Sequence, residues 1–364
     1  MKILWLTNIP SPYRVDFFNE LGKYCDLTVL FEKKTSAERD DSWAKFNINN
    51  FKAIFLKGKS IGVAEALCFE VMKYINNSYD HIVVTNFSDP TGIIAIIYMK
   101  LKGISYEIES DGGFVGTGKG LKEMFKKWLL SGAKLYFSTA EEHDNYYLTY
   151  GAKSDQIVRY PFTSLFEKDI LEHPVDEKIK ENLRKELQIN EEEVILAVGQ
   201  FIYRKGFDVL IKAASLLPSK VGIYIVGGEP TEEYLQLRKK YNLKNVHFCG
   251  FMKTQELEKY YILADIFVHP TREDIWGLVI NEAMAKGLPV ITTNRCVAGL
   301  ELITDDSIGQ IIPVGDAHKL ALAISKQIET ISNERSNLVL NRIKEFTVEQ
   351  MAQVHLKAFI NTKS

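Results

Sequence analysis

The chemically most informative residues of the chain lie within residues 265–293. Two acids in this stretch, Asp274 and Glu282, stand on either side of Gly277. A β-branched run at residues 266–268 predicts a buried parallel strand, and the apolar spacing after Gly277 predicts a helix. Ligands bind at the carboxyl edge of open parallel sheets, and the first N–H groups of a helix favour phosphate. The stretch therefore predicts an anion-binding site.

A second segment offers two adjacent cations after another predicted strand. The strand ends at Gly199, and Arg204 and Lys205 precede the next expected helix. At the carboxyl edge of a sheet, the guanidinium of Arg204 could bind a diphosphate through two parallel hydrogen bonds, and the ammonium group of Lys205 could bind it as a point charge. Such a pair, taken alone, is more often a solvated turn. Beside the first stretch, it predicts a diphosphate site.

The first stretch carries a resemblance to a known family. Residues 274–283, DIWGLVINEA, resemble the Glu–seven residues–Glu signature of glycosyltransferase family 4 (group 1), whose members are retaining enzymes with the GT-B fold. The resemblance covers most of residues 190–315 and is weak in the first half. The first acid is Asp274 with Glu273 before it, and Gln200 stands where the family often has Arg. The fold implied is α/β, with two Rossmann-like doubly wound domains facing each other across a cleft.

By this resemblance, the second domain would hold a nucleotide-diphosphate sugar. Glu282 would bind the ribose hydroxyls, and Asp274 or Glu273 would bind hydroxyls of the sugar. Arg204 and Lys205 would stabilise the charge that develops on the leaving diphosphate. The residues expected to bind the donor are Gly199, Phe251, Glu273, Gly277, Leu278, Val279 and Glu282.

Two segments of the first half are candidates for an acceptor site. Residues 8–14 predict a loop with two prolines, an aromatic ring and a cation, for which a rigid structural turn is the alternative. Asp111 follows the strand expected at residues 105–109, where it could bind the transferred sugar or the acceptor hydroxyl, or simply cap a turn. The residues expected to bind the acceptor are Pro12, Tyr13, Arg14, Gly112 and Gly113. The expected catalytic residues are Asp111, Asp274, Arg204 and Lys205.

The sequence also argues against several other classes of protein. Residues 113–119 have P-loop spacing, but Gly120 stands where a Mg²⁺-binding hydroxyl would be, so we expect a flexible glycine loop and not an NTPase. Without GxGxxG after the first strand, a dehydrogenase is not expected. Four cysteines without metal spacing predict reduced thiols, and no credible Asp-x-Asp ends a strand, so we expect neither a metal nor another cofactor. A net charge of -2 gives no attraction to nucleic acid.

Strand and helix patterns alternate along the chain, which predicts parallel doubly wound sheets. The charged residues 163–192 interrupt the alternation and predict an interdomain connection with a surface helix. We therefore place an N-terminal acceptor-binding domain at residues 1–165 and a C-terminal nucleotide-sugar-binding domain at residues 166–345. In residues 346–364, an amphipathic helix at 348–360 would, by the resemblance, pack back on the first domain.

Three details of the first domain are predicted from local pattern. Residues 32–50 predict a long polar loop, and residues 63–75 have helical spacing. After the loop at residues 8–14, a helix is expected to begin at Val15.

The resemblance implies a hexosyltransferase-type enzyme that moves a sugar, with retention and without a metal, to a glycan or lipid-linked glycan. Bacterial surface polysaccharide assembly is the implied setting. Two alternatives remain open, a GT-B-fold sugar-nucleotide epimerase and a non-catalytic sugar-nucleotide-binding subunit. An epimerase would convert the donor without an acceptor, and a binding subunit would release no nucleotide.

Residues 119–130 alternate lysines with large apolar residues, which on a helix gives a cationic rim and an apolar face. Such a helix could rest on anionic lipid, although an ordinary surface helix has the same pattern. No apolar stretch reaches the length of a membrane span. We expect a cytoplasmic protein, at the inner face of the membrane if this helix binds lipid.

Overall fold

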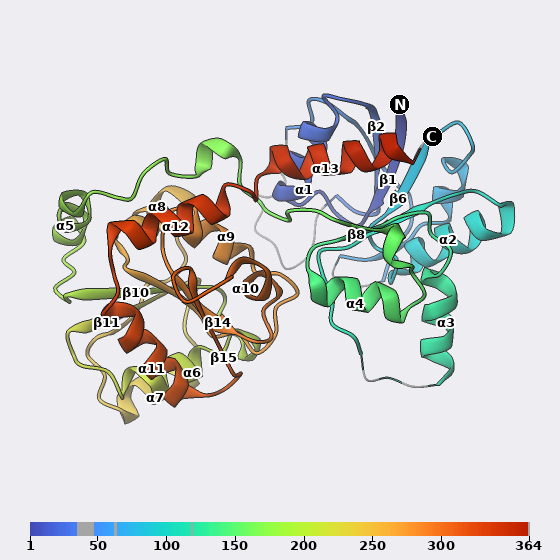
Figure 1. Ribbon diagram of the computed structural model, residues 1–364. Coiled ribbons are helices and arrows are strands. Elements are labelled where there is room, and N and C mark those ends of the chain that lie inside the picture. The colour runs from blue at the N-terminus through green and yellow to red at the C-terminus, as the bar shows by residue number, and fades with distance from the viewer. Residues whose placement is uncertain (35–46, 62–63, 117, 119, 363–364) are drawn as a thin grey trace. The chain divides into compact units, whose positions relative to one another are not determined.

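The computed structural model describes the chain at residues 1–34, 47–61, 64–116, 118 and 120–362. The chain divides into two compact units (Figure 1). Unit 1 comprises Met1–Ser164 and Thr347–Ser364, and unit 2 comprises Leu165–Phe346. Within the described residues, no helix of either unit is long and apolar enough to cross a membrane.

The described part of unit 1 contains a seven-stranded sheet in the order β3-β2-β1-β6-β7-β8-β9, in which neighbouring strands run parallel. Short runs of β-branched and aromatic residues produce these strands, because both faces of the sheet are covered. The strands are β1 (Lys2–Thr7), β2 (Asp26–Phe31), β3 (Lys52–Phe55), β6 (His81–Val84), β7 (Glu107–Glu109), β8 (Tyr136–Ser138) and β9 (Ile157–Arg159).

Helices cover both faces of this sheet (Figure 1). On one face, α1 (Pro12–Leu21) lies beside α13 (Val348–Asn361). The other face carries α2 (Pro90–Lys102), α3 (Leu121–Leu130) and α4 (Glu141–Thr149). The last helix of the chain therefore belongs to the core that the first residues build.

The contact between α13 and the sheet of unit 1 is aromatic. Phe359 and His355 of α13 are fully buried. The ring of His355 stacks on Phe137 with centroids 4.2 Å apart, and the ring of Phe359 lies 5.4 Å from Phe137 and 4.6 Å from His81. Aromatic rings at these separations contribute attraction beyond the area that they bury.

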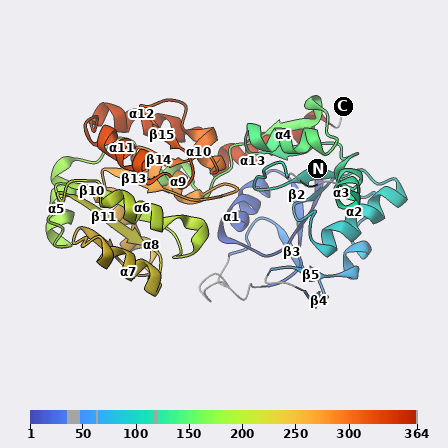
Figure 2. The ribbon, with the colours of Figure 1, turned by 90° about the horizontal axis from the view of Figure 1, so that it is seen from below.

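The helix predicted over residues 63–75 is wrong. This segment contains β5 (Ala66–Leu67), which pairs with β4 (Lys59–Ser60), and a 3₁₀ turn, η2 (Phe69–Lys73). Figure 2 shows this hairpin near β3. Tertiary hydrogen bonds hold the segment extended, because the carboxylate of Glu32 accepts a bond from the backbone N–H of Ala66 at 2.9 Å. Local spacing cannot anticipate such a distant partner.

Two other local predictions need comment. Helix α1 begins at Pro12 and not at Val15, so Pro12, Tyr13 and Arg14 lie in its first turn and not in a loop. Proline is favoured at the first position of a helix. An N–H group there would have no acceptor within the helix, so its absence costs nothing, and the φ angle of proline is already helical. Much of the loop expected at 32–50, and Lys119 of the lysine-rich helix, lie outside the described residues.

Unit 2 contains, in its described residues, a six-stranded sheet in the order β12-β11-β10-β13-β14-β15, again with parallel neighbours. Its strands are β10 (Glu193–Val198), β11 (Val221–Val226), β12 (Val246–Phe248), β13 (Ile266–His269), β14 (Val290–Thr293) and β15 (Gly309–Ile312). These strands match the apolar runs of the sequence, with bounds that differ by at most two residues.

Helices also cover both faces of this sheet (Figure 1). One face carries α6 (Phe207–Ala214), α7 (Glu232–Lys240) and α11 (Ala317–Ile328). The other carries α5 (Glu177–Glu186), α8 (Thr254–Leu263), α9 (Leu278–Met284), α10 (Val297–Leu302) and α12 (Asn333–Ile343). The sequence patterns did not single out α7, α10 or α12. Short 3₁₀ turns complete the chain at η3 (Ser154–Gln156), η4 (Glu167–Asp169) and η5 (Tyr203–Lys205).

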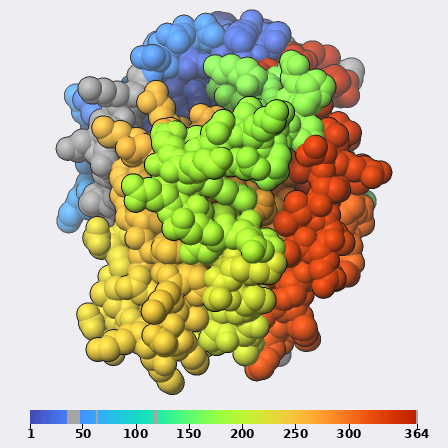
Figure 3. Space-filling model, turned by 90° about the vertical axis from the view of Figure 1, so that its left-hand side faces the viewer, coloured from blue at the N-terminus to red at the C-terminus, as the bar shows by residue number. Residues whose placement is uncertain are grey.

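The surface helix expected within residues 163–192 is α5. Figure 3 shows α5 on the surface of unit 2, between gold residues of the α7 and α8 region and red residues of α11 and α12. Its Lys180 and Arg184 lie 3.3 Å and 2.7 Å from the carboxylate of Asp265, which precedes β13. These ion pairs attach a highly charged helix, which has no buried residue of its own, to the sheet.

The packing of α13 gives a prediction about stability. Replacing Phe359 with Ala should lower the free energy of unfolding by about 3–5 kcal/mol, because it leaves a cavity among aromatic rings. The neighbouring Ile360 is 55% exposed, and Ile360→Ala should change the stability by about 0.5 kcal/mol or less. Urea unfolding followed by circular dichroism measures both. Equal effects of the two replacements would show that α13 does not stabilise unit 1.

Candidate functional site

Glycines follow three strands of unit 2 and lie against one another at the edge of the sheet. The N–H of Gly199 donates to the carbonyl of Val226 at 2.9 Å, and the N–H of Gly227 donates to Gly250 at 2.9 Å. A Cβ on Gly227, whose φ is 145°, would lie 2.0 Å from the carbonyl oxygen of Gly199. Glycine is required for this approach. The carboxyl edge of β10, β11 and β12 is therefore bare backbone, and the exposed ring of Phe251 follows it.

Asp274 lies at the centre of a cationic cluster beside this edge. Its Oδ2 lies 2.6 Å from Nζ of Lys205 and 3.0 Å from Nε2 of His269. Its Oδ1 lies 3.2 Å from Nη1 of Arg204. Burial alone would raise the pKa of Asp274, but the hydrogen bond from His269 and the charge of Lys205 outweigh it and hold the pKa well below its usual range. The carboxylate is therefore ionised at neutral pH.

Backbone contacts fix this acid in place. The N–H of Asp274 donates to the carbonyl of Arg295 at 2.8 Å, and its own carbonyl accepts from the N–H of Val297 at 3.2 Å. Gly277, the N-cap of α9, has a φ of 108°, and a Cβ there would lie 3.2 Å from Sγ of Cys296. The segments that follow β13 and β14 are thus joined, with Leu278 and Val279 half-buried in the first turn of α9.

The segment of the two cations is joined to the same place. The N–H of Arg272 donates to the carbonyl of Arg204 at 2.7 Å, and Nη1 of Arg204 donates to the carbonyl of Glu273 at 2.9 Å. A Cβ on Gly206, whose φ is 71°, would lie 2.0 Å from the carbonyl oxygen of Pro270. The η5 turn therefore keeps its position against the loop after β13.

The other predicted acids of unit 2 lie in different surroundings. Glu282 in α9 is half-buried, and its Oε2 accepts a hydrogen bond from the Tyr261 hydroxyl of α8 at 2.8 Å. Burial raises the pKa of Glu282, and the bond from Tyr261 opposes that shift. Glu273 is exposed and forms an ion pair with Arg295. Sequence reasoning gave no role to His269, Tyr261 or Arg295. The position of His269 at the end of a strand was the available signal.

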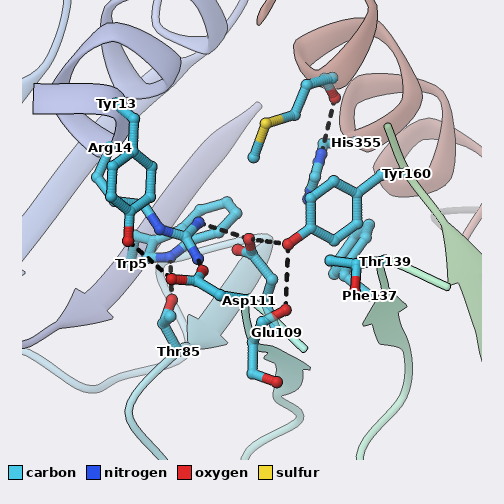
Figure 4. Close-up of polar contacts among 12 residues, drawn as sticks. Trp5, Tyr13, Arg14, Thr85, Glu109, Asp111, Phe137, Thr139, Tyr160 and His355 are labelled. Carbon is cyan, nitrogen blue, oxygen red and sulfur yellow. Dashed lines mark hydrogen bonds and ion pairs between the residues drawn. The ribbon is translucent and has the colours of Figure 1, made fainter. Parts of the chain in front are cut away.

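In unit 1, two of the predicted acceptor residues, Tyr13 and Arg14, form a second cluster with Glu109, Asp111 and Tyr160 (Figure 4). Arg14 is buried between two acids, with Nη1 2.5 Å from Oε1 of Glu109 and Nη2 paired with Asp111. The hydroxyl of Tyr13 donates to Asp111 at 2.7 Å, and that of Tyr160 donates to Glu109 at 2.9 Å. Burial would lower the pKa of Arg14, but the two carboxylates hold it well above its usual value.

This cluster separates the predicted residues of unit 1 into two kinds. The guanidinium of Arg14 is 2% exposed and is used by the two acids, so it can organise the site but is not open to a ligand. Asp111, Gly112 and Gly113 are partly exposed, and Pro12 is exposed. Sequence reasoning assigned no role to Glu109 or Tyr160, because their part depends on Arg14, which lies far away in the sequence.

A buried histidine supports the loop that carries Asp111. The backbone N–H of Thr139 donates to Nδ1 of His143 at 3.3 Å, so Nε2 carries the proton and donates to Oγ of Ser110 at 2.8 Å. Ser110 in turn donates to the carbonyl of Gly112 at 3.2 Å. Burial lowers the pKa of His143 to about 3. The neutral imidazole therefore orders the turn after β7.

Residues 179–344, which lie in unit 2, match the family model described as glycosyl transferases group 1. A stretch of 164 residues is 31% identical to an uncharacterized 41.2 kDa protein in the cps region of Klebsiella pneumoniae, covering 43% of this chain and 44% of that protein. A stretch of 127 residues is 31% identical to the lipopolysaccharide glucosyltransferase WaaG of Escherichia coli, covering 34% of this chain and 33% of WaaG. The chain thus matches less than half the length of these relatives.

Solved structures resemble the whole chain. The crystal structure of HepE from Anabaena in complex with UDP has a TM-score of 0.78 and 18% identity, over 99% of this chain and 100% of HepE. A sucrose-phosphate synthase from Thermosynechococcus elongatus has a TM-score of 0.72 and 20% identity, over 100% of both chains. Likeness at these identities shows the fold. It confirms the predicted α/β class, GT-B with two Rossmann-like domains.

The environment of His143 predicts a pH dependence of stability. An imidazole with a folded-state pKa of about 3 binds its proton more readily in the unfolded chain, where the pKa is about 6.5, so stability falls as the pH drops below that value. His143→Gln should reduce the loss between pH 6.5 and pH 4 by up to about 3 kcal/mol. Urea unfolding at stepped pH measures this slope. Parallel curves for the two proteins would contradict the assignment.

Proposed function

We propose that this chain is a glycosyltransferase that moves a sugar from a nucleotide-diphosphate sugar to a glycan or a lipid-linked glycan. The observation that carries the proposal is the Asp274 cluster, which holds Lys205 and Arg204 at the carboxyl edge of the second Rossmann-like unit. The names of two similar proteins agree with it, since WaaG is a lipopolysaccharide glucosyltransferase and HepE was solved with UDP. Bacterial surface polysaccharide assembly is the proposed setting.

The donor would lie along the edge of unit 2. Bare backbone at Gly199 and the exposed ring of Phe251 leave room for a nucleoside, and the half-buried Glu282 would accept hydrogen bonds from ribose hydroxyls. Lys205 and Arg204 would bind the diphosphate, with N–H groups of Gly277, Leu278 and Val279 supplementing them. Asp274 or Glu273 would lie at the transferred sugar.

The proposed mechanism is electrostatic. As the bond between the sugar and the diphosphate breaks, negative charge grows on the leaving oxygen, and the fixed cations Lys205 and Arg204 stabilise it. We propose that they do so without a metal ion or another cofactor. We propose that retention follows from attack of the acceptor hydroxyl on the face that the diphosphate leaves, with the hydroxyl proton passing to the leaving phosphate oxygen.

Unit 1 would bind the acceptor. Asp111 is held by Arg14 and Tyr13, yet its side chain is 28% exposed, so one carboxylate can be both fixed and open to a hydroxyl group. Gly112 and Pro12 would border the acceptor. In this proposal Arg14 sets the orientation of Asp111 and does not touch the acceptor.

We also propose that α3 contacts an anionic lipid surface at the cytoplasmic face of a membrane. Four large apolar side chains of this helix are exposed, with Leu121 at 84% and Met124 at 67%, and the rings of Phe125 and Trp128 lie 5.8 Å apart. Within α3, the buried residues are the last two. Lysines border the apolar residues, as an interfacial helix on anionic lipid requires. They are Lys122, Lys126 and Lys127.

The donor proposal is tested with Lys205→Ala. A thermal-shift panel of UDP, GDP, TDP, ADP and CMP identifies the nucleotide, and release of nucleoside diphosphate from its sugar conjugates gives the rate. Lys205→Ala should lower kcat/KM about 10- to 100-fold, because one charged hydrogen bond is lost. The control is Lys212→Ala. Lys212 also lies in unit 2 and pairs with Asp208 on α6, and its replacement should leave the rate unchanged.

Two outcomes would contradict this proposal. Nucleotide binding without any release of nucleoside diphosphate would indicate a non-catalytic binding subunit. Conversion of the donor to another sugar nucleotide without an acceptor would indicate an epimerase. Loss of the rate on adding EDTA would contradict metal independence.

The lipid proposal is tested by co-sedimentation with phosphatidylglycerol vesicles. The double replacement Leu121→Ser and Phe125→Ser should weaken binding about tenfold or more, because each apolar side chain contributes about 1.5–3 kcal/mol when fully buried. The matched control replaces the exposed Leu216 and Leu322 of unit 2 with Ser. Equal binding of both double variants would contradict a lipid contact through α3.

A further inference from the structure

Two neighbouring acids at the donor edge, Glu273 and Asp274, have opposite surroundings. The side chain of Asp274 is 11% exposed, whereas that of Glu273 is 53% exposed. They follow the same strand, β13, and lie next to each other in the chain. Both are candidates to bind the transferred sugar, so their surroundings decide which of them can do so.

The carboxylate of Asp274 is already used by the protein. Its Oδ2 contacts Lys205 and His269, and its Oδ1 contacts Arg204, so three donors occupy a group that offers about four lone-pair sites. Its main chain is also held on both sides, by Arg295 and Val297. At most one lone-pair site is left for a sugar hydroxyl on a side chain that is only 11% exposed, and displacing a charged partner from a buried carboxylate is costly.

Asp274 also keeps the two cations together. Lys205 and Arg204 are consecutive residues with like charges, and the side chain of Lys205 is 14% exposed. Without the carboxylate of Asp274 between them, the two cations would repel each other, and the repulsion would be strong because Lys205 is partly shielded from water. The role that these contacts fit is to hold the cations where a diphosphate needs them.

Glu273 has the properties that a sugar-binding acid requires. Its carboxylate pairs with the guanidinium of Arg295, which follows β14, and both side chains are about half exposed. Such an exposed ion pair contributes little to stability, so its hydrogen bonds can be exchanged for those of a ligand at small cost. The pair offers acceptors and donors side by side, which match adjacent hydroxyl groups of a sugar.

We infer that Glu273, together with Arg295, binds the hydroxyl groups of the transferred sugar, and that Asp274 is a positioning residue for Lys205 and Arg204. This inference rests on the proposed donor site in unit 2. It assigns to Glu273 the contact that the sequence signature would place at Asp274.

The test compares binding of UDP and UDP-glucose, and of GDP and GDP-mannose, by isothermal titration calorimetry. Glu273→Gln should leave the affinity for the free diphosphate within twofold and lower that for the sugar conjugate about tenfold. Asp274→Asn should lower both affinities by the same factor, and Asp274→Glu, which keeps the charge, should recover part of the loss. Glu186→Gln is the matched control, because Glu186 is 55% exposed and pairs with Lys259 in unit 2 outside the site.

The outcomes separate this inference from the proposed function. Absence of binding of UDP, GDP, TDP and ADP alike by the unmodified protein would overturn the donor site itself. Binding with selective loss of the sugar conjugate in Asp274→Asn, or an unchanged conjugate affinity in Glu273→Gln, would overturn the division of roles. Because Glu273 is exposed, Glu273→Gln should fold normally. This variant alone therefore tests whether Glu273 binds the sugar, even if Asp274→Asn does not fold.

Discussion

The cost of burying a charge governs the architecture of both clusters in this protein. An ionised carboxylate away from water is strongly unfavourable unless cations and hydrogen-bond donors surround it. Asp274 meets this condition with Lys205, Arg204 and His269, which come from two different segments of unit 2. The same condition binds the η5 turn to the loop after β13. The electrostatic requirement thus fixes the position of two chain segments at once.

Unit 1 meets the same condition with the signs reversed. Its buried charge is the guanidinium of Arg14, and Glu109 and Asp111 at the end of β7 neutralise it. Since Arg14 lies in the first turn of α1, the network attaches that helix to the carboxyl end of the sheet. The aromatic side chains of α13 close the core beside it, with His355 next to the ring of Tyr160 at 4.6 Å. The last helix of the chain therefore packs beside the cluster around Arg14, which lies near the start of the chain.

Rigid supports and open groups are kept apart in both clusters. In unit 2, the buried Asp274 holds cations while Glu273 and Phe251 remain exposed. In unit 1, the buried Arg14 holds Asp111, whose carboxylate stays partly open. A ligand-binding group needs both a fixed geometry and free hydrogen-bonding capacity, so a buried neighbour has to supply the first while the group itself keeps the second. Pairs of neighbouring residues with unequal burial meet the two needs here.

The sequence by itself determined the α/β class and nearly every strand, because buried parallel strands are short apolar runs that local composition encodes. It also placed Asp274, Arg204 and Lys205 after strands whose carboxyl ends must share one edge. Tertiary structure alone decided that residues 66–67 form a strand and not a helix, because the N–H of Ala66 donates the deciding hydrogen bond to the carboxylate of the distant Glu32. It alone decided which acid is buried and which cation it meets. Charge pairing depends on distances of a few ångströms between segments far apart in the chain, and local pattern carries no such distances.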